Sequence, residues 1–585
     1  MGLRWKVRQH DAQLIRAIER ESKVSPILAQ ILALRGITSP SQVSTFLDLK
    51  MTGLRSPETL PGITQATSVI YSAITENKKI FIYGDYDCDG MTATAIMYRC
   101  LKILGGNVFY FIPSRLDDGY GLNRECLEKL HQRGAQLIVT VDCGIASVDE
   151  VAFARSLGIE MVITDHHHCG AALPDAEAIV HPALPGDPYP FAGLCGAGVA
   201  FKLAWSLCQC HHGSPKLSEP LREFLFAAVS LASLGTVADV VPLIDENRIL
   251  VHFGLACLKQ FANPGLTHLL KLSKCYDKPR LSSEDIAYSI GPRLNAAGRL
   301  GQAQLGVELL TCESDERAKQ LADHIDQLNK NRDTLDRKIL RAAHQLIKAH
   351  HDAENDPALV LAQPDWHLGV IGIAAGRIAD HYHRPTVIIS LDPLGNRPGV
   401  GSCRTSCGVN LYRALEGSRE HLISFGGHEA AAGIRLDESQ VDAFRETFFE
   451  QIAEQVCVDN FIPDLDIDAE ALIGNLTLST MHELEKLAPF GQDNPRPVLC
   501  VSGVHLAEPV KTMGEDGRHL CLTLKQHDSK IRAVAFGKSE WASNLNDIEA
   551  PYDFAFRPVI NDYRGYRSVE LHLIDYRVSH TIASV

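Results

Sequence analysis

Three aspartates at alternate positions directly follow an apolar run, and this stretch limits what the chain can fold into. Residues 80–83 are apolar, Asp85, Asp87 and Asp89 come next, and apolar residues then recur at helical spacing from 96 to 104. A short continuous apolar run is typical of a strand buried on both faces of a parallel sheet. Two like charges about 4 Å apart repel by roughly 4 kcal/mol at an effective dielectric of about 20, so the carboxylates need a cation or shared protons. The stretch predicts a strand, an acidic turn and a helix, with a divalent metal site as the functional hypothesis and a solvated acidic turn as the alternative.

The pattern of an apolar strand followed by a polar turn and a helix recurs. The further units are residues 107–112 before Arg115, residues 137–141 before Asp142, and residues 161–164 before Asp165. Four such units predict a doubly wound parallel sheet, in which ligands bind outside the carboxyl ends of the strands. The turns contain neither GxGxxG nor GxxxxGK[ST], so the sequence indicates neither a dinucleotide site nor a P-loop.

Several polar residues at these strand ends are candidate metal ligands. Asp142 alone can be a helix N-cap, but three histidines that end a buried strand, at 166–168, have no packing purpose. Asp239 interrupts an apolar stretch, and a buried unpaired carboxylate costs several kcal/mol. Carboxylates and imidazoles without thiolate spacing favour manganese or magnesium, and Asp165 can orient a ligating imidazole. The candidates suffice for two ions, which can clamp a phosphodiester; they are Asp87, Asp89, Asp142, His166, His167 and Asp239.

Composition sets further limits. At 585 residues the chain should form several domains, and without a long apolar run or a signal-peptide core it is expected to be soluble, intracellular and without a membrane segment. The 16 cysteines lack CxxC pairs and are expected to be reduced thiols; the run from Cys208 to His212 lacks the second ligand pair of a zinc finger. The net charge of −14 argues against non-specific nucleic-acid binding over the whole surface, but not against a local basic groove.

Six motifs in their order along the chain resemble a known family. They are GDYDCDG at 84–90, VDCG at 141–144, DHH at 165–167, GTVAD at 235–239, GPRLNAAGR at 291–299 and GGHEAAAG at 426–433. With these motifs the sequence resembles the DHH phosphoesterase superfamily and, within it, the bacterial RecJ single-strand exonucleases. The likeness spans almost the whole chain.

The resemblance implies roles for the site residues. Its metal ligands would be Asp87, Asp89, Asp142, His166 and Asp239, holding two Mn²⁺ or Mg²⁺ ions. His167 would lie at the metal centre or on the substrate phosphate, with Asp85 and Asp165 as supporting residues. Two positions depart from the family pattern: Tyr83 stands where many relatives carry a histidine ligand, and His168 extends the usual histidine pair.

Substrate contacts are also implied by the resemblance. Arg115, Ser402 and Arg404 are expected to converge on the terminal phosphate of a strand. The complete set of expected substrate-binding residues is Arg115, Tyr120, Arg293, Asn295, Arg299, Ser402, Arg404, Gly426, Gly427 and His428.

Five segments describe the expected architecture, an α/β fold whose parallel-sheet domain is joined by a long helix to a smaller α/β domain and a barrel. They are a helical cap (1–60), the DHH catalytic domain (61–312), a connecting helix (313–352), a DHH-associated substrate-binding domain (353–456), and a linker with an OB-like barrel (457–585). Short strands separated by turns favour the barrel. Phe536, Tyr563 and Tyr566, interleaved with arginines and lysines, are candidate stacking residues for single-stranded nucleic acid.

The expected activity is metal-dependent 5′-to-3′ hydrolysis of single-stranded DNA to mononucleotides, in DNA repair and recombination. The expected partners are single-stranded DNA with a 5′ end, single-strand-binding protein and a helicase, and the expected state is a cytoplasmic monomer. Two alternatives remain. One is a DHH-type phosphodiesterase for short oligoribonucleotides or other small phosphoesters, and the other is a non-catalytic DNA-binding scaffold.

Overall fold

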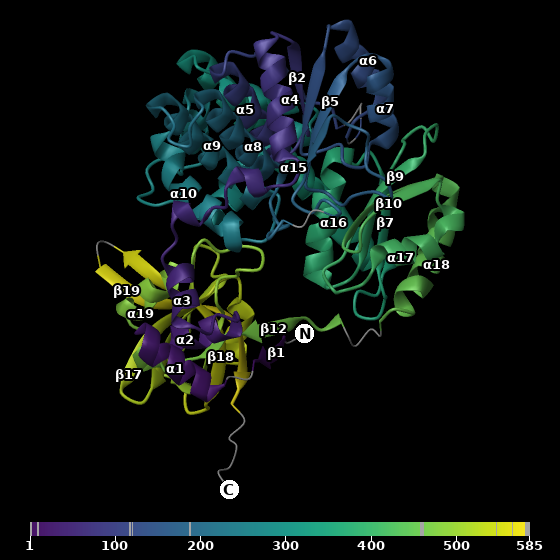
Figure 1. The fold of residues 1–585 in the computed structure, drawn as a ribbon. Coiled ribbons are helices and arrows are strands. Elements are labelled where there is room, and N and C mark those ends of the chain that lie inside the picture. Colours follow the sequence, from purple (N-terminus) through teal and green to yellow (C-terminus); the bar gives the residue numbers. More distant parts are fainter. Residues whose placement is uncertain are drawn as a thin grey trace. The chain divides into compact units, whose positions relative to one another are not determined.

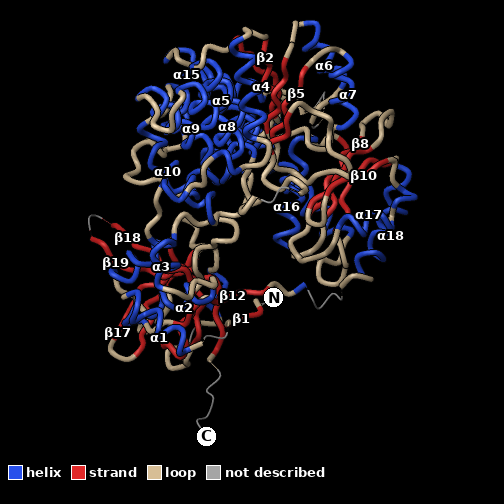
Figure 2. Tube along the Cα trace, viewed as in Figure 1, coloured by secondary structure: helices blue, strands red, loops and turns tan. Residues whose placement is uncertain are grey.

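The computed structural model describes residues 3–8, 11–115, 119, 121–186, 189–456, 461–545, 547–563 and 566–579, the Tyr563 side chain excepted. The chain divides into two compact units (Figures 1 and 2). One comprises residues 1–49, 462–490 and 495–585, and the other comprises residues 50–461 with 491–494. Each unit is described on its own.

A parallel sheet organises the larger unit. Its strands are β2 (Lys79–Gly84), β3 (Asn107–Phe111), β4 (Leu137–Val141), β5 (Glu160–Thr164) and β6 (Ala178–Val180), in the order β3-β2-β4-β5-β6. The four predicted strands and their parallel pairing are confirmed. The order of the strands reverses between β2 and β4, and a doubly wound sheet binds its ligands at such a reversal. The acidic turn follows β2 and Asp142 follows β4, so both lie at this point.

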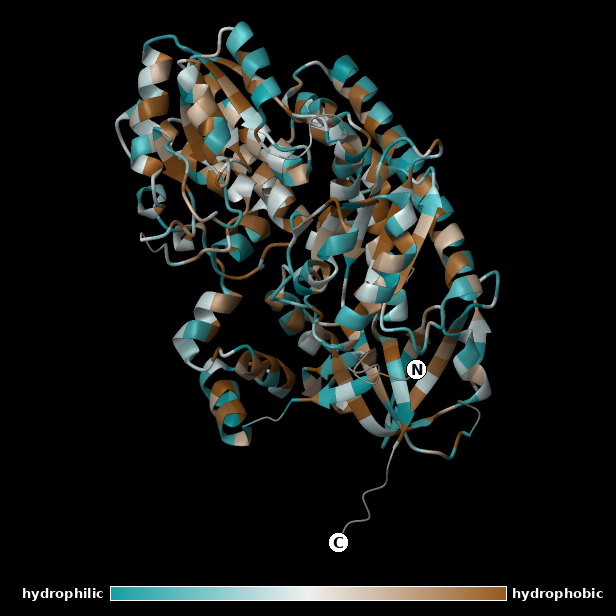
Figure 3. Cartoon of the chain, turned by 90° about the vertical axis from the view of Figure 1, so that its right-hand side faces the viewer, coloured by the Kyte–Doolittle hydropathy of each residue, from teal (hydrophilic) through white to brown (hydrophobic). Residues whose placement is uncertain are grey.

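Helices cover both faces of this sheet, as a doubly wound fold requires (Figure 1). One face of the sheet is covered by α4 (Ile63–Thr75), α5 (Cys88–Ile103) and α8 (Gly196–His212). The opposite face shares a hydrophobic cluster with α6 (Arg124–Gln132) and α7 (Val148–Ser156). Strands β2, β4 and β5 are hydrophobic along nearly their whole length, because neither face meets water; brown strands of this kind are visible inside the larger unit in Figure 3.

One described helix, α9 (Glu219–Ala238), is long and apolar enough to cross a membrane, and 67% of its apolar window is buried in the protein. It is followed by α10 (Asp245–Gln260), α11 (Pro264–Leu272), α12 (Ser283–Asp285), the π-helix η3 (Ile286–Ile290), α13 (Gly291–Arg299) and α14 (Ala303–Thr311). Helix α9 packs against α5, α8 and α10.

A 36-residue helix, α15 (Asp315–His350), leads to the second domain of this unit. Its mixed sheet has the order β10-β11-β9-β8-β7. The strands are β7 (Leu359–Pro364), β8 (Thr386–Leu391), β9 (Gly399–Arg404), β10 (Ser424–Gly427) and β11 (Ala431–Leu436), with helices α16 (Leu368–Tyr382), α17 (Leu411–Gly417) and α18 (Val441–Ala453). Ile339, Ala343 and Ile347 of α15 share a hydrophobic cluster with α16 and the sheet, so the carboxyl-terminal half of the long helix belongs to the core of this domain. The amino-terminal half packs against α11, α13 and α14.

The smaller unit contains the predicted barrel. Its main strands are β14 (Leu499–Leu506), β16 (His519–Gln526), β17 (Ser529–Ala535), β18 (Tyr552–Tyr563) and β19 (Tyr566–Val578). Pairing of β14 with both β16 and β18 closes the barrel, as the short strands and turns of the sequence predicted.

The amino-terminal helices α1 (Ala12–Ser22), α2 (Pro26–Leu34) and α3 (Pro40–Leu47) pack on this barrel. Helix α2 is apolar on nearly every side, and Ile27, Leu28 and Ile31 join a core that includes Leu520 and Phe554. The sequence analysis treated the cap and the barrel separately, and their shared core is a finding of the structure.

Candidate metal centre

The first strand and the helix after it place the acidic turn. Asp87 is the N-cap of α5, where its side chain accepts a hydrogen bond from the Gly90 amide at 3.0 Å, and Asp89 lies in the first helical turn. The positive end of a helix dipole favours carboxylates at these positions. Tyr83 stands where many relatives carry a histidine ligand. Its hydroxyl instead donates a hydrogen bond to the Gly121 carbonyl at 2.9 Å, and its ring packs in the hydrophobic cluster under α6 and α7. The turn therefore presents aspartates rather than Tyr83 to the site.

Asp142 occupies a strained position at the end of β4. Its φ of 64° lies in the left-handed region, which costs a non-glycine residue of order 1 kcal/mol or more. Gly196 makes room for it, because a Cβ at Gly196 would lie 2.5 Å from the Asp142 Cβ. Such a conformation persists where the surroundings enforce it, and here it aims the carboxylate at the imidazole of His166.

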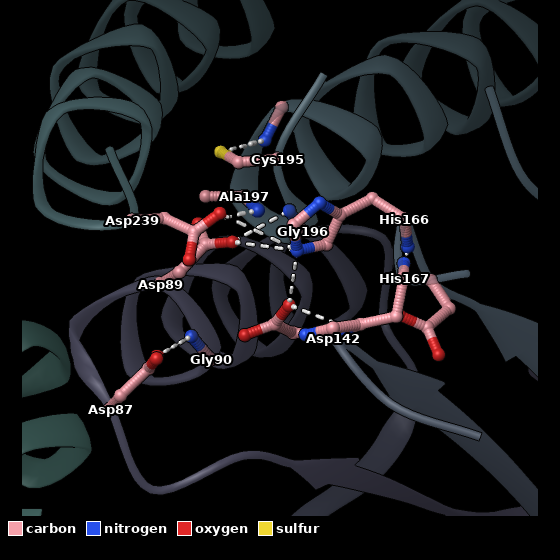
Figure 4. Close-up of polar contacts among 12 residues, drawn as sticks. Asp87, Asp89, Gly90, Asp142, His166, His167, Cys195, Gly196, Ala197 and Asp239 are labelled. Carbon is pink, nitrogen blue, oxygen red and sulfur yellow. Dashed lines mark hydrogen bonds and ion pairs between the residues drawn. The ribbon is translucent and has the colours of Figure 1, made fainter. Parts of the chain in front are cut away.

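His166 is at the centre of the cluster (Figure 4). Its Nε2 lies 3.1 Å from Asp142 Oδ1, 3.6 Å from Asp239 Oδ2 and 3.8 Å from Asp89 Oδ2. Asp239 comes from the carboxyl end of α9. The structure thus brings together residues from four separate segments of the chain, as expected for strand ends that meet at one edge of a sheet.

Asp165 fixes the histidine pair. Its Oδ1 accepts hydrogen bonds from the His166 and His167 amides at 2.7 and 3.1 Å and lies 2.8 Å from His167 Nδ1, while Oδ2 accepts from the Ile145 amide at 3.0 Å. All four contacts restrain the loop that carries the imidazoles. This is the arrangement expected of a supporting carboxylate.

Three overlapping groups of side chains can each hold a metal ion, their ligand atoms lying within 4.8 Å of one another. The groups are Asp142, His166 and His167; Asp89, His166 and Asp239; and Asp85, Asp87 and Asp142. The cysteines and histidines at 208–212 belong to none of these groups among the described residues.

Unpaired buried atoms test whether an ion fits here. Asp85 Oδ1, Asp142 Oδ1 and His166 Nε2 are buried, and each lacks a hydrogen bond of good geometry to any described residue. Buried polar atoms are nearly always satisfied, so three such atoms in one cluster call for a ligand. Oxygen and imidazole ligands suit a divalent cation.

The electrostatics agree with this interpretation. Burial, followed by the neighbouring aspartates, raises the pKa of Asp85 and Asp142 well above the ordinary value, and the same causes raise the pKa of Asp239 to about 9. Although burial opposes both shifts, the hydrogen bond between Asp165 and His167 lowers the pKa of Asp165 to about 2 and raises the pKa of His167 to about 9. Without a cation, the cluster must therefore hold protons near neutral pH.

We expect metal binding to release protons. The raised pKa values mean that the metal-free protein holds protons up to about pH 9, and an ion must displace them. A carboxylate whose folded-state pKa is raised stabilises the fold below the unfolded value, near 4, and loses that contribution as the pH rises through about 9. Mn²⁺ affinity should therefore increase, and the melting temperature in chelator should decrease, between pH 6 and 8.5. Calorimetry in buffers of different ionisation enthalpy measures the released protons, and Mn²⁺ binding without proton release would contradict these pKa shifts.

The amino terminus of α8 was not predicted as part of the site. Both oxygens of Asp89 accept from its first backbone amides, at 2.6 Å from Gly196 and 2.9 Å from Ala197. Gly235 is packed against the same carboxylate, since a Cβ there would lie 2.2 Å from Asp89 Oδ1. Each oxygen keeps a second lone pair for an ion. The only sequence signal was the run of small residues at 195–198.

His181, just after β6, was also missed. Its Nδ1 accepts from the Ala183 amide at 3.0 Å, so the neutral ring carries its proton on Nε2 and donates to the His167 carbonyl at 2.8 Å. His181 is buried and fixes the peptide that follows the histidine pair.

Replacing His181 by leucine should therefore weaken Mn²⁺ binding by about 10-fold or more, the usual effect of removing a residue that orients ligands. His351→Leu is the matched control, because His351 is another buried imidazole with two partners, Asp356 and Val360, away from the cluster. Calorimetric titration compares the two variants. Equal Mn²⁺ affinity in both would exclude a positioning role for His181.

Predicted substrate residues gather beside the cluster. The Arg115 guanidinium lies over the Tyr86 ring at 5.1 Å, and Arg404 donates to Ser402 Oγ at 3.0 Å. Burial and then the neighbouring Arg115, Arg332 and Arg404 lower the pKa of Arg299 to about 10. Guanidinium groups this close together repel one another, and an anion between them would relieve the repulsion.

The other predicted substrate residues have varied surroundings. Asn295 accepts from the Cys88 amide at 2.8 Å and so holds the acidic turn, while Arg293 pairs with Asp326 of α15 at 2.8 Å. The His428 ring lies 5.4 Å from that of His168, next to Gly426 and Gly427 at the end of β10. Tyr120 lies outside the described residues. Substrate contact by these residues stays a prediction.

A sheet with this strand order and a carboxylate–imidazole cluster at its reversal point define a protein of the DHH class. The model of the DHH family, N-terminal domain, matches residues 79–229, that of the DHHA1 domain matches 355–454, and that of the RecJ OB domain matches 467–575.

Curated relatives narrow this class. The single-stranded-DNA-specific exonuclease RecJ of Dickeya dadantii is 36% identical over 94% of this chain and 96% of its own length, and that of Escherichia coli is 34% identical over 94% and 95%. The chain belongs to the RecJ family. It spans 66% of the length of the Bacillus subtilis protein, at 36% identity. The crystal structure of Thermus thermophilus RecJ in complex with Mn²⁺ matches 99% of this chain and 80% of its own, with a TM-score of 0.82 and 29% identity.

Proposed function

We propose that this chain is a metal-dependent exonuclease that hydrolyses the phosphodiester bonds of single-stranded DNA from the 5′ end and releases mononucleotides. One observation carries the proposal. The buried cluster at the strand reversal has three ligand atoms without a hydrogen bond, and arginines gather next to it. The names of the RecJ relatives support single-stranded DNA as the substrate. The activity would serve DNA repair and recombination.

Two Mn²⁺ or Mg²⁺ ions fit the donor set. The Thermus thermophilus RecJ structures were determined with Mn²⁺ and with Mg²⁺. In this chain Asp87, Asp89, Asp142, His166 and Asp239 would hold the ions, with Asp85 supporting them. When bound, such ions neutralise the carboxylates, polarise the scissile phosphate and supply an activated water.

The side chains around the ions have roles of their own. His167 points Nδ1 at Asp165, and its raised pKa keeps it protonated at neutral pH, so its second ring nitrogen is suited to donate to a substrate oxygen. Arg115, Arg299 and Arg404, with Ser402, are suited to the terminal phosphate, because guanidinium groups bind phosphate through parallel hydrogen bonds. A terminal phosphate carries more charge than an internal one, which favours a 5′-phosphorylated end.

The remaining assignments extend the same proposal. Residues 61–312 would carry the chemistry and, together with 353–456, the phosphate contacts. Residues 457–585 would supply the affinity for long strands, because Phe536 and Tyr566 in this segment expose 52% and 83% of their surface for stacking. Partner proteins would be a single-strand-binding protein and a helicase, and the protein would act as a monomer in the cytoplasm.

A substrate panel tests the proposal against small-phosphoester hydrolysis. Single-stranded DNA, duplex DNA, RNA oligomers of about 5 nucleotides and a cyclic dinucleotide are each incubated with Mn²⁺, Mg²⁺ or chelator. The proposal expects metal-dependent release of deoxynucleotides from single-stranded DNA at a kcat/KM at least about 100-fold above the others, a difference of about 2.7 kcal/mol. A preference for the short RNA or the cyclic dinucleotide would contradict it.

A further inference from the structure

Tyr86 stands between two aspartates of the acidic turn, Asp85 and Asp87. Its backbone is fixed from one side by α13: a Cβ at Gly298 would lie 1.9 Å from the Tyr86 carbonyl oxygen, and Asn295 accepts from the amide of Cys88. The side chain has its own place, half-buried under the guanidinium of Arg115. The geometry therefore separates the two functions of the turn, with carboxylates facing the metal centre and a ring facing the arginines.

The Tyr86 ring contacts the guanidinium of Arg115 without occupying the N–H groups of the guanidinium. The Arg115 Cζ lies 5.1 Å from the centre of the Tyr86 ring, within the range of a cation–π interaction. Among the ion pairs of the described residues, none involves Arg115. A carboxylate partner would occupy the guanidinium N–H groups and compete with a phosphate, whereas an aromatic face leaves all five N–H groups available.

We propose that the Tyr86 ring is a platform that positions Arg115 for the terminal 5′-phosphate, which makes Tyr86 a specificity-determining positioning residue. This inference rests on the proposed 5′-end function. The ring limits the rotamers of a long side chain, so less conformational entropy is lost when the phosphate binds. The ring acts on the end of the strand, and the metals act on the scissile bond.

The test compares full-length variants on single-stranded DNA with a 5′-phosphate or a 5′-hydroxyl. Tyr86→Phe keeps the ring and should keep the wild-type ratio of kcat/KM values between the two ends within about twofold. Tyr86→Leu and Tyr86→Met remove the π face and should reduce this ratio by about 3- to 30-fold, through KM on the phosphorylated strand, as the strength of cation–π contacts implies. Two non-aromatic variants are used so that, if one of them fails to fold, the other still tests the inference.

A double-mutant cycle separates a role through Arg115 from a general packing role. In an Arg115→Ala background, Tyr86→Leu should cause no further loss of 5′-phosphate preference. Calorimetric Mn²⁺ titration should give Tyr86→Leu an affinity within about twofold of the wild type. Retention of the full preference by Tyr86→Leu and Tyr86→Met, or a loss explained by weaker Mn²⁺ binding, would overturn the inference. A wild type without 5′-phosphate preference would instead contradict the proposed 5′-end function itself.

Discussion

Replacing Asp142 by asparagine should lower metal-dependent hydrolysis of single-stranded DNA by at least about 1,000-fold, about 4 kcal/mol of transition-state stabilisation. Asp142 belongs to two of the three candidate metal groups, and its Oδ1 has no hydrogen bond and lies 3.1 Å from His166 Nε2. The amide keeps the shape of the side chain but removes one anionic oxygen. Turnover of a labelled strand with saturating Mn²⁺ measures the effect.

The same substitution should stabilise the metal-free protein above pH 7. Burial and four neighbouring carboxylates raise the pKa of Asp142, so its ionisation opposes folding as the pH rises. Asp285→Asn is the matched control, because Asp285 is a mostly buried aspartate that accepts from the amide of Ser282, the N-cap of α12, and pairs with Lys278. The control should lose stability and keep its turnover. An Asp142→Asn enzyme with more than about a tenth of the wild-type rate would show that this carboxylate is not a metal ligand.

Arg404→Ala should reduce the preference for a 5′-phosphorylated end by about 10- to 100-fold. Arg404 donates to Ser402 Oγ and to the Cys403 carbonyl, so its guanidinium is held in place, and Gly372 leaves it space, because a Cβ there would lie 3.0 Å from Arg404 Nη2. A charge-assisted pair of hydrogen bonds to phosphate accounts for a loss of this size. The loss should appear in KM on phosphorylated strands, with Mn²⁺ binding unchanged.

Arg445→Ala is the matched control, since Arg445 lies on α18 of the same domain and pairs with the exposed Asp442. It should keep the wild-type preference for the 5′-phosphate. If Arg404→Ala kept the preference as well, the terminal phosphate would bind elsewhere.

Local sequence patterns predicted four of the five strands of the parallel sheet and the polar residues that follow them. Apolar runs of buried strands are continuous in the sequence, and each is followed by the polar residues that the strand delivers to the site. Asp87, Asp142 and His166 were therefore recognisable one by one, and the rule that parallel strands end at one edge brought them together.

Contacts between distant segments were not predictable in this way. The backbone amides of Gly196 and Ala197 carry no side-chain signal, although they hold Asp89. His181 reads as an isolated histidine until β6 places it beside the loop of His167. The pairing of Arg293 with Asp326 depends on how α13 packs against α15. The core that residues 1–49 share with the barrel joins opposite ends of the chain, which no local pattern predicts.

End-labelled digestion tests the central claim most directly. Two 5′-phosphorylated single strands are prepared, one with a fluorophore on an internal base near the 5′ end and one with it near the 3′ end. Each strand is incubated with the wild-type protein and Mn²⁺. The metal centre and the neighbouring arginines, Arg115, Arg299 and Arg404, together predict early release of the label near the 5′ end. They also predict late release of the label near the 3′ end and no release in chelator. Early release of the 3′ label, or release in chelator, would contradict this account of the site.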